Sequence, residues 1–214
     1  MLAMSTSLCH TRRMAAGKTY HHGNLRTALL TASLALIRKE GLHGFTLREV
    51  ARRAGVSHNA PYRHFRDRSD LLAAIAEDGF NRLTAKIREA SSQGHSHLER
   101  LRLAGIAYVQ FGLDRPEEFN VMFSTEWDPA THPAAKAAAE ESFGSIVSLV
   151  VDCQRAGLLP RYDPRTAAQI AWAHVHGIAE LVRRRQLAFN TRQEIVDFTA
   201  IATAALYTGI AGPA

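Results

Sequence analysis

The sequence predicts an all-α fold of about nine helices, in which a small helix-turn-helix domain precedes a larger helical domain. Three observations support this. Apolar residues recur every three or four positions, capping residues open the successive segments, and no segment has the alternating pattern of a strand. With 214 residues, of which 46% are hydrophobic, the chain can bury a sizeable core.

The chain begins with a polar segment. Residues 1–20 are basic, show no periodicity and are expected to form a flexible arm. A first helix is then expected from Asn24, a good N-cap, to Glu40, and Gly41 ends it. The arm contains three methionines that could each be the start of translation: Met1, Met4 and Met14.

Residues 46–64 have the pattern of two short helices joined by a tight turn. Thr46 and Glu49 have the spacing of a capping box, which opens the first helix. Gly55 can adopt the positive φ that the turn requires, and Ser57 is a suitable N-cap for a second helix over about residues 58–64. Pro61 lies near the limit at which a missing N–H is tolerated in a first helical turn. This layout is typical of a helix-turn-helix whose second helix enters the major groove of DNA.

Six further helices are expected after this motif. Their starts are marked by capping residues or by proline in the first turn, as at Asp67, Pro116 and Asp163-Pro164. We place a helix-turn-helix domain at residues 21–68 and a second domain at residues 69–214. The expected helices span about 67–92, 97–113, 116 to the loop at 128–133, 134–156, 164–186 and 191–207.

The charge is distributed unevenly along the chain. Residues 1–70 contain 12 basic and 4 acidic residues, a net charge of +8, whereas residues 71–214 contain 14 and 16, a net charge of −2. A basic segment around a helix-turn-helix is the electrostatic pattern expected of a DNA-binding domain. The alternative is that these basic side chains are only solvated at the surface and bind nothing. The capped helices and the turn glycine favour DNA binding over this alternative.

Several classes of protein are disfavoured. No run of about 18 apolar residues suggests a membrane span, and the N-terminus has no apolar signal segment. The two cysteines lie in distant segments, so a reducing bacterial cytoplasm, at the nucleoid, is the expected compartment. We find no nucleophile with its base, no carboxylate pair and no metal-ligand spacing; His174 and His176 point to different faces of a helix. We therefore expect no catalytic residue, metal or cofactor.

The segment from Phe45 to Leu72 resembles the DNA-binding domain of the TetR/AcrR family of bacterial transcriptional regulators, and residues 25–41 resemble the first helix of that family. Two positions depart from the usual pattern: Arg68 stands where lysine is common, and Asn59-Ala60-Pro61 replaces a Gly-Thr-Leu-like sequence. The residues that carry the resemblance are Phe45-Thr46, Val50-Ala51, Ala54-Gly55-Val56-Ser57, Tyr62, His64-Phe65 and Asp70-Leu71-Leu72.

The resemblance implies a set of DNA contacts. Thr46, Tyr62 and Arg68 are expected to hold phosphates, and Arg48 belongs to the same basic segment. Asn59 is the best candidate for reading a base, because asparagine can bond adenine through two hydrogen bonds. The side chains expected to face the groove are Ser57, His58, Asn59 and His64.

The family binds small molecules in the C-terminal half, so an apolar effector pocket is expected there. The spacing of Trp172, His176 and Gly177 resembles a subgroup with a Trp-His-Gly C-terminal domain. For His176 a structural hydrogen bond and a ligand contact both remain possible. Of the aromatic and methionine cluster at residues 108–127, two or three members are expected to line the pocket and the rest to pack in the core. The candidate pocket residues are Phe111, Phe119, Met122, Phe123, Trp127, Trp172 and His176.

The helix over 164–186 is apolar nearly all round, so it is expected to be buried on two sides. One side can face its own core and the other a second copy of the chain. The family resemblance likewise implies that the last two helices form a four-helix dimer interface. The candidate interface residues are Ile178, Leu181, Val182, Phe198, Ala202 and Ala205.

Together these features predict a homodimeric regulator that binds a near-palindromic double-stranded operator. The leading hypothesis is a repressor released by a small apolar or aromatic effector. The alternatives are an activator, or a ligand-independent DNA-binding protein, with the same fold. An enzyme is the alternative of a different class.

Overall fold

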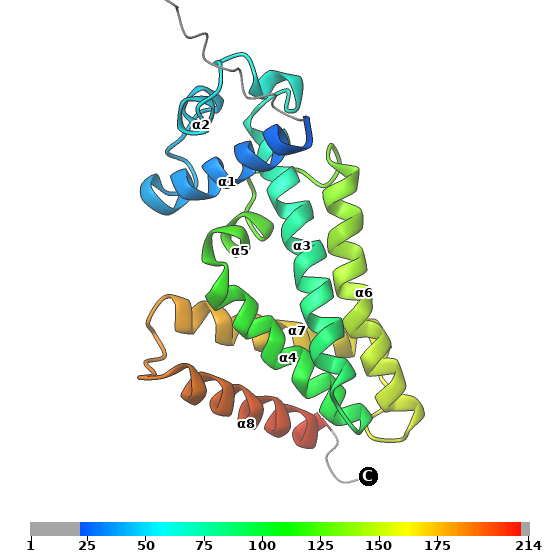
Figure 1. The fold of residues 1–214 in the computed structure, drawn as a ribbon. Helices are drawn as coiled ribbons and strands as arrows, with labels where there is room; N and C mark the ends of the chain where they lie inside the picture. The colour runs from blue at the N-terminus through cyan, green and yellow to red at the C-terminus, as the bar shows by residue number, and fades with distance from the viewer. Residues whose placement is uncertain (1–21, 211–214) are drawn as a thin grey trace, which may run out of the picture.

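The computed structural model describes residues 22–210, and this part of the chain contains eight α-helices, one short 3-10 helix and no strand. The expected flexible arm and the three methionines lie outside it. Helices α1, α2 and the 3-10 helix form one end of the molecule, α4, α7 and α8 lie toward the other, α5 lies next to α1, and α6 runs the length of the molecule beside α3 (Figure 1). The bounds are α1 His22–Glu40, α2 Leu47–Arg53, the 3-10 helix Pro61–Arg63, α3 Arg68–Ser92, α4 His97–Asp114, α5 Pro116–Met122, α6 Pro133–Arg155, α7 Pro164–Arg183 and α8 Arg192–Ile210.

The N-terminal domain folds around a small apolar core. Leu29, Val50 and Leu71 are fully buried, and Phe65 seals the same cluster. The predicted capping box opens α2: the Glu49 N–H donates to Thr46 Oγ1 at 3.3 Å, and the Thr46 N–H donates to Glu49 Oε2 at 2.7 Å. Satisfying these otherwise free amides fixes where α2 begins.

The second helix of the motif differs from its expected form. Instead of an α-helix over residues 58–64, the structure has turns followed by a single 3-10 turn, Pro61–Arg63. Its backbone bonds join residues three apart, from Ala60 N to Ser57 O at 2.9 Å and from His64 N to Pro61 O at 2.9 Å. Pro61 has no N–H, so it cannot make the bond to Ser57 O that an α-helix needs at this point.

Helix α3 connects the two ends of the molecule. It starts at the helix-turn-helix and runs down to the far end, lying beside α6 for much of its length (Figure 1). Asp67 caps it by accepting from the Asp70 N–H at 2.9 Å. Its apolar face is buried along most of its length, from Leu71 to Ile87. One rigid helix therefore spans the DNA-binding end and the core of the second domain.

In the C-terminal domain α4 packs against α7 and α8. The three helices approach closely at Gly105, where an added Cβ would lie 3.2 Å from Val175 on α7 and 3.3 Å from Thr203 on α8. Helix α7 ends at Arg183 rather than at the expected Gln186, because Arg185 adopts a positive φ of 57° that breaks the helix. None of the helices in the described part of the chain is long and apolar enough to cross a membrane.

Candidate functional site

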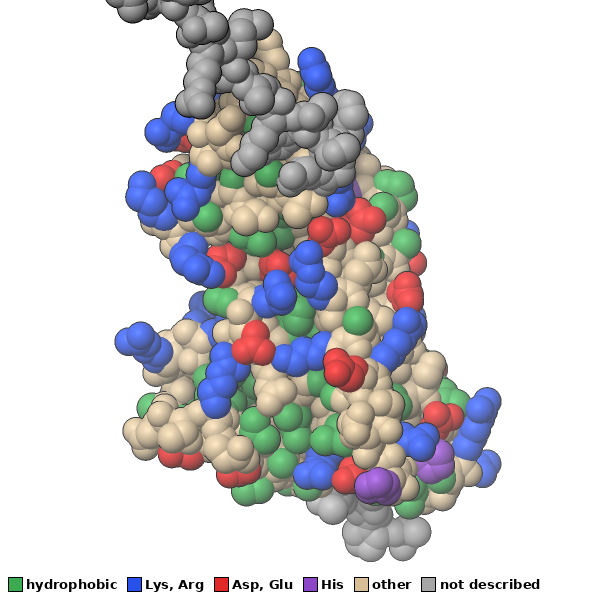
Figure 2. Space-filling model, in the orientation of Figure 1, with side chains coloured by type: hydrophobic (Ala, Val, Ile, Leu, Met, Phe, Trp, Pro, Cys, Tyr) green, Lys and Arg blue, Asp and Glu red, His purple; other side chains and the backbone are tan. Residues whose placement is uncertain are grey.

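The outer face of α2 and of the following turn carries unpaired positive charge. Arg48, Arg52, Arg53 and Arg63 are all exposed, and none of them forms an ion pair with another described residue. Several basic side chains are visible around this end of the molecule (Figure 2). Such guanidinium groups are free to neutralise phosphates.

The turn places polar side chains on the same surface. Ser57, His58 and Asn59 are exposed, and the Tyr62 ring is 51% exposed. All four side chains are therefore accessible from solvent. His64 is only partly accessible; its Nε2 is buried without a hydrogen-bond partner among the described residues, and its ring lies beside Phe65.

Two residues expected to bind phosphate are already engaged. The Thr46 hydroxyl donates to Glu49 Oε2 at 2.9 Å. The Arg68 guanidinium contacts Glu126 Oε2 at 2.5 Å, donates to the Leu42 carbonyl and lies over the Phe45 ring. In this structure Arg68 is therefore engaged by a partly buried carboxylate and a carbonyl, which compete with phosphate for its guanidinium.

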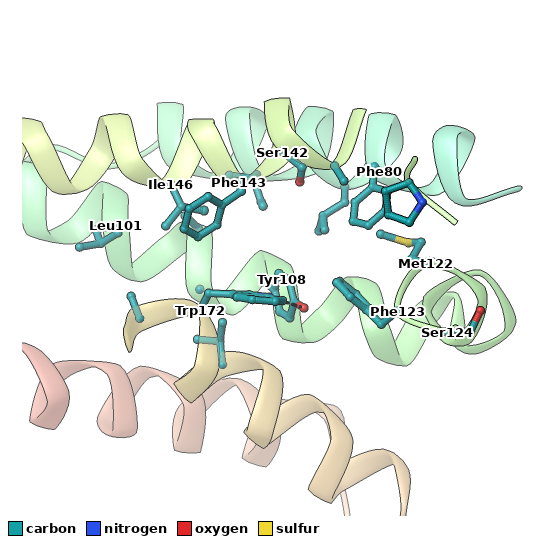
Figure 3. Close-up of a pocket in the computed structure, with 18 of the residues that line it drawn as sticks. Phe80, Leu101, Tyr108, Met122, Phe123, Ser124, Ser142, Phe143, Ile146 and Trp172 are labelled. Atoms are coloured by element: carbon teal, nitrogen blue, oxygen red, sulfur yellow. Dashed lines mark hydrogen bonds between the residues drawn. The ribbon is translucent and has the colours of Figure 1, made fainter. Parts of the chain in front are cut away.

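A cavity of about 340 Å³ lies inside the C-terminal domain, between α3, α4, α6 and α7 (Figure 3). Four of the predicted pocket residues line it: Met122, Phe123, Trp127 and Trp172. Within the 108–127 cluster, Tyr108 also lines it, so four members of this cluster face the cavity where two or three were expected. The other predicted residues, Phe111, Phe119 and His176, are not among the lining residues.

Sequence reasoning missed the side of the cavity formed by α3 and α6. Phe80 from α3 and Ser142, Phe143 and Ile146 from α6 line it. In the sequence, Phe143 and Ile146 interrupt an alanine-rich helix, which is the one signal that this face contacts something large. The helical pattern shows that these side chains share a face but not what that face meets.

His176 takes part in a hydrogen-bonded group behind the cavity wall. The Trp172 Nε1–H donates to the Tyr108 hydroxyl at 3.0 Å, and that hydroxyl lies 2.7 Å from His176 Nδ1. Burial lowers the pKa of His176 and raises the pKa of Tyr108. Both groups are therefore neutral near pH 7, and the tautomer of the imidazole decides which of the two donates. The structural hydrogen bond, one of the two roles left open for His176, is present.

The segment after α5 contacts both the cavity and the DNA-binding domain. Phe123, Ser124 and Trp127 line the cavity. Between them, Glu126 binds Arg68 and lies 3.0 Å from His43 Nδ1, and its carbonyl accepts from the Ser69 hydroxyl at 3.1 Å. The hydrogen bond from Arg68 lowers the pKa of Glu126, so this carboxylate stays ionised well into acid.

Helices α7 and α8 bury one face and leave an apolar second face uncovered. Ile178, expected at the dimer interface, is only 5% exposed and packs in the protein's own core. The outward face of α7 carries Ile170 and Leu181, and Gly177 has no atom within 4 Å of where a Cβ would lie. On α8, Ile201 is 70% exposed; Ala205 is exposed, and Val182, Phe198 and Ala202 are half-buried. Figure 2 shows apolar side chains gathered over α8.

An exposed basic helix-turn-helix joined to a helical domain with an apolar cavity defines a class, the DNA-binding transcription regulators. Residues 29–75 match the family of bacterial regulatory proteins of the TetR type, and residues 101–205 match the tetracycline repressor-like C-terminal domain. The chain belongs to the TetR family of transcriptional regulators, and is accordingly a regulator rather than an enzyme.

One regulator and two solved structures illustrate the similarity of this chain to known proteins. The transcriptional regulator BetI of Serratia proteamaculans is 27% identical over 79% of this chain and 86% of its own length. A solved Rhodococcus protein of unknown function is 35% identical with a TM-score of 0.79, covering 91% of this chain and all of that one. The regulator FadR of Bacillus subtilis, solved with stearoyl-CoA, has a TM-score of 0.72 at 15% identity, covering 86% of this chain and 98% of its own, and shows the shared fold alone.

Proposed function

We propose that this regulator is a homodimeric repressor that binds a near-palindromic operator and is released when a small apolar molecule occupies the cavity. The observation that carries the proposal is the segment 123–127, which lines the cavity and also holds the DNA-binding domain through Glu126. The same fold acting as an activator is an alternative, and one relative, FasR of Mycolicibacterium smegmatis, is named an activator.

For DNA recognition we propose that the exposed turn at 57–59 enters the major groove. Asn59 reads a base, and Ser57 and His58 lie beside it. Tyr62 and the free guanidinium of Arg48 hold the backbone on either side. We leave Arg68 out of this set, because its charge is neutralised by Glu126.

For dimerisation we propose that α7 and α8 pair with their copies around a two-fold axis. An isologous interface needs a self-complementary apolar surface, which Ile170, Leu181 and Ile201 provide. Gly177 leaves open space on that face for the backbone of a partner helix. Two DNA-binding domains are then presented to successive major grooves, about 34–36 Å apart.

For release we propose that the effector and the operator favour different positions of α3. A ligand that moves Phe123 or Trp127 moves Glu126 with them, and Glu126 holds Arg68 at the start of α3. A second ion pair, Arg38 Nε to Glu117 Oε1 at 2.6 Å, joins α1 to α5. The effector must bind the two arrangements unequally, since equal affinity shifts no equilibrium.

The test begins with selection of bound sequences from random DNA, followed by fluorescence anisotropy on the selected site. We expect Asn59→Ala to lose about 1–3 kcal/mol at one base pair and to leave affinity for random DNA unchanged. Arg48→Ala should weaken both kinds of DNA and reduce the slope against salt by about one. Asn81→Ala, on the exposed side of α3, is the matched control. Equal losses on selected and random DNA for Asn59→Ala would exclude base reading by this residue.

A further inference from the structure

The cavity contains no charged side chain. None of its lining residues is Asp, Glu, Lys, Arg or His, and its walls are mainly aromatic and aliphatic. An anion or a cation bound inside would be buried without a side chain of opposite charge, which strongly disfavours it. A volume of about 340 Å³ equals roughly eleven water molecules at about 30 Å³ each, so it suits a compact molecule of about ten to fifteen non-hydrogen atoms.

Four hydroxyl groups belong to the lining residues, and two of them are engaged. Tyr108 accepts from Trp172 and lies 2.7 Å from His176 Nδ1. The Ser124 hydroxyl donates to the Val121 carbonyl at 3.0 Å. The other two, on Ser142 and Tyr207, make no hydrogen bond with any described residue, although both side chains are buried.

Ser142 occupies the more central position of these two. It projects from α6 toward the space between Phe80 and the Tyr108–Trp172 pair (Figure 3). It is 5% exposed and makes no hydrogen bond with another described residue, so its hydroxyl is free to bond a molecule that enters the cavity. Tyr207 belongs to a separate apolar cluster with Leu101, and Leu101 lies at the end of the cavity opposite Phe80 (Figure 3).

Building on the proposed function, we infer that Ser142 determines effector specificity: its hydroxyl binds the single polar group of an uncharged, mainly hydrocarbon effector. The aromatic walls hold the apolar part, and the hydrogen bond to Ser142 fixes its orientation. The effector class is thus a neutral alcohol, phenol, ketone or ester of compact size. Carboxylates and quaternary ammonium compounds are disfavoured.

Four probes of matched shape test this: 4-propylphenol, propylbenzene, 4-propylbenzoate and (4-propylphenyl)trimethylammonium. Both tryptophans of the chain, Trp127 and Trp172, line the cavity, so their fluorescence reports binding directly. We expect the wild-type protein to bind 4-propylphenol two- to twelvefold more tightly than propylbenzene, the range that one hydrogen bond provides, and to bind the two ions more weakly.

Two variants identify the hydroxyl responsible. Ser142→Ala should bind both neutral probes equally, while Tyr207→Phe, which removes the other free hydroxyl, should keep the preference for the phenol. The inference is overturned if Ser142→Ala retains the preference, if Tyr207→Phe loses it, if an ion binds most tightly, or if no probe binds up to its solubility limit. Affinity for the selected operator, measured separately, tests the proposed DNA-binding function independently of each of these outcomes.

Discussion

The clearest quantitative expectation concerns Ile201 on α8. Its side chain is 70% exposed in the single chain, although isoleucine is among the residues most often buried. Burying a whole isoleucine side chain contributes about 1.5–3 kcal/mol, so covering the exposed part contributes about 1–2 kcal/mol. In a two-fold dimer the residue occurs twice, which gives about 2–4 kcal/mol.

Replacing this side chain by alanine, Ile201→Ala, removes most of that contribution, and Ile201→Glu adds the cost of burying an unpaired charge. Loss of the whole apolar contribution would raise the dimer dissociation constant by about 30- to 1,000-fold, so we expect an increase of at least about 30-fold in Ile201→Glu. Sedimentation equilibrium over a range of concentrations measures it. Tyr162→Glu is the matched control, because Tyr162 is also a large exposed side chain, at 58%, but precedes α7. A folded Ile201→Glu variant with the wild-type dimer constant would refute the proposed interface.

Two further predictions concern the cavity wall and the domain junction. In Glu126→Gln, Arg68 loses its charge partner. We therefore expect the effect of 4-propylphenol on operator affinity, measured by anisotropy titration, to be at least threefold smaller than in wild type. An unchanged effect would contradict coupling between the cavity and the DNA-binding domain through Glu126. The pKa of His176 is lowered in the folded state, so its stabilising effect is full above the unfolded pKa of about 6.5 and declines as pH falls below it. Thermal melts at about pH 8 and about pH 5.5 should show a smaller acid loss in His176→Gln than in wild type. Equal losses would show that folding does not lower the pKa of His176.

Much of the fold followed from local chemistry. Thr46 with Glu49 and Asp163 before Pro164 opened helices where expected, since a cap depends only on residues three positions away. The prediction of an α-helix around Pro61 was wrong. Pro61 has no N–H to donate to the carbonyl four residues earlier, and the chain forms a 3-10 turn there instead.

The site was harder to predict because it depends on packing between distant segments. On α7, which is apolar on most sides, periodicity could not separate Ile178, which faces the core, from Leu181, which faces outward. Ser142 lies in an alanine-rich helix without any local sign of its role, and only the approach of α6 to α3 and α4 places it in a cavity wall. Arg68 kept the charge expected for a phosphate contact, but Glu126, 58 residues away, binds it.

In the proposed mode of recognition the reading element is the turn at 57–59, which is followed by a single 3-10 turn, Pro61–Arg63, rather than by a longer helix, so one protomer can distinguish few sites in a genome. So short a reading element reaches few base edges, and each good contact discriminates by about 1–3 kcal/mol. Against the 10⁶–10⁹ competing sites that a genome offers, one such half-site is insufficient, on this order-of-magnitude scale. Doubling the contacts by symmetry doubles the free energy of discrimination and so squares the selectivity ratio. In the proposed dimer, recognition of an operator then depends on the distance between the two reading turns as much as on the bases that they contact. A change in that distance would lower the affinity for the operator without altering any contact within a half-site.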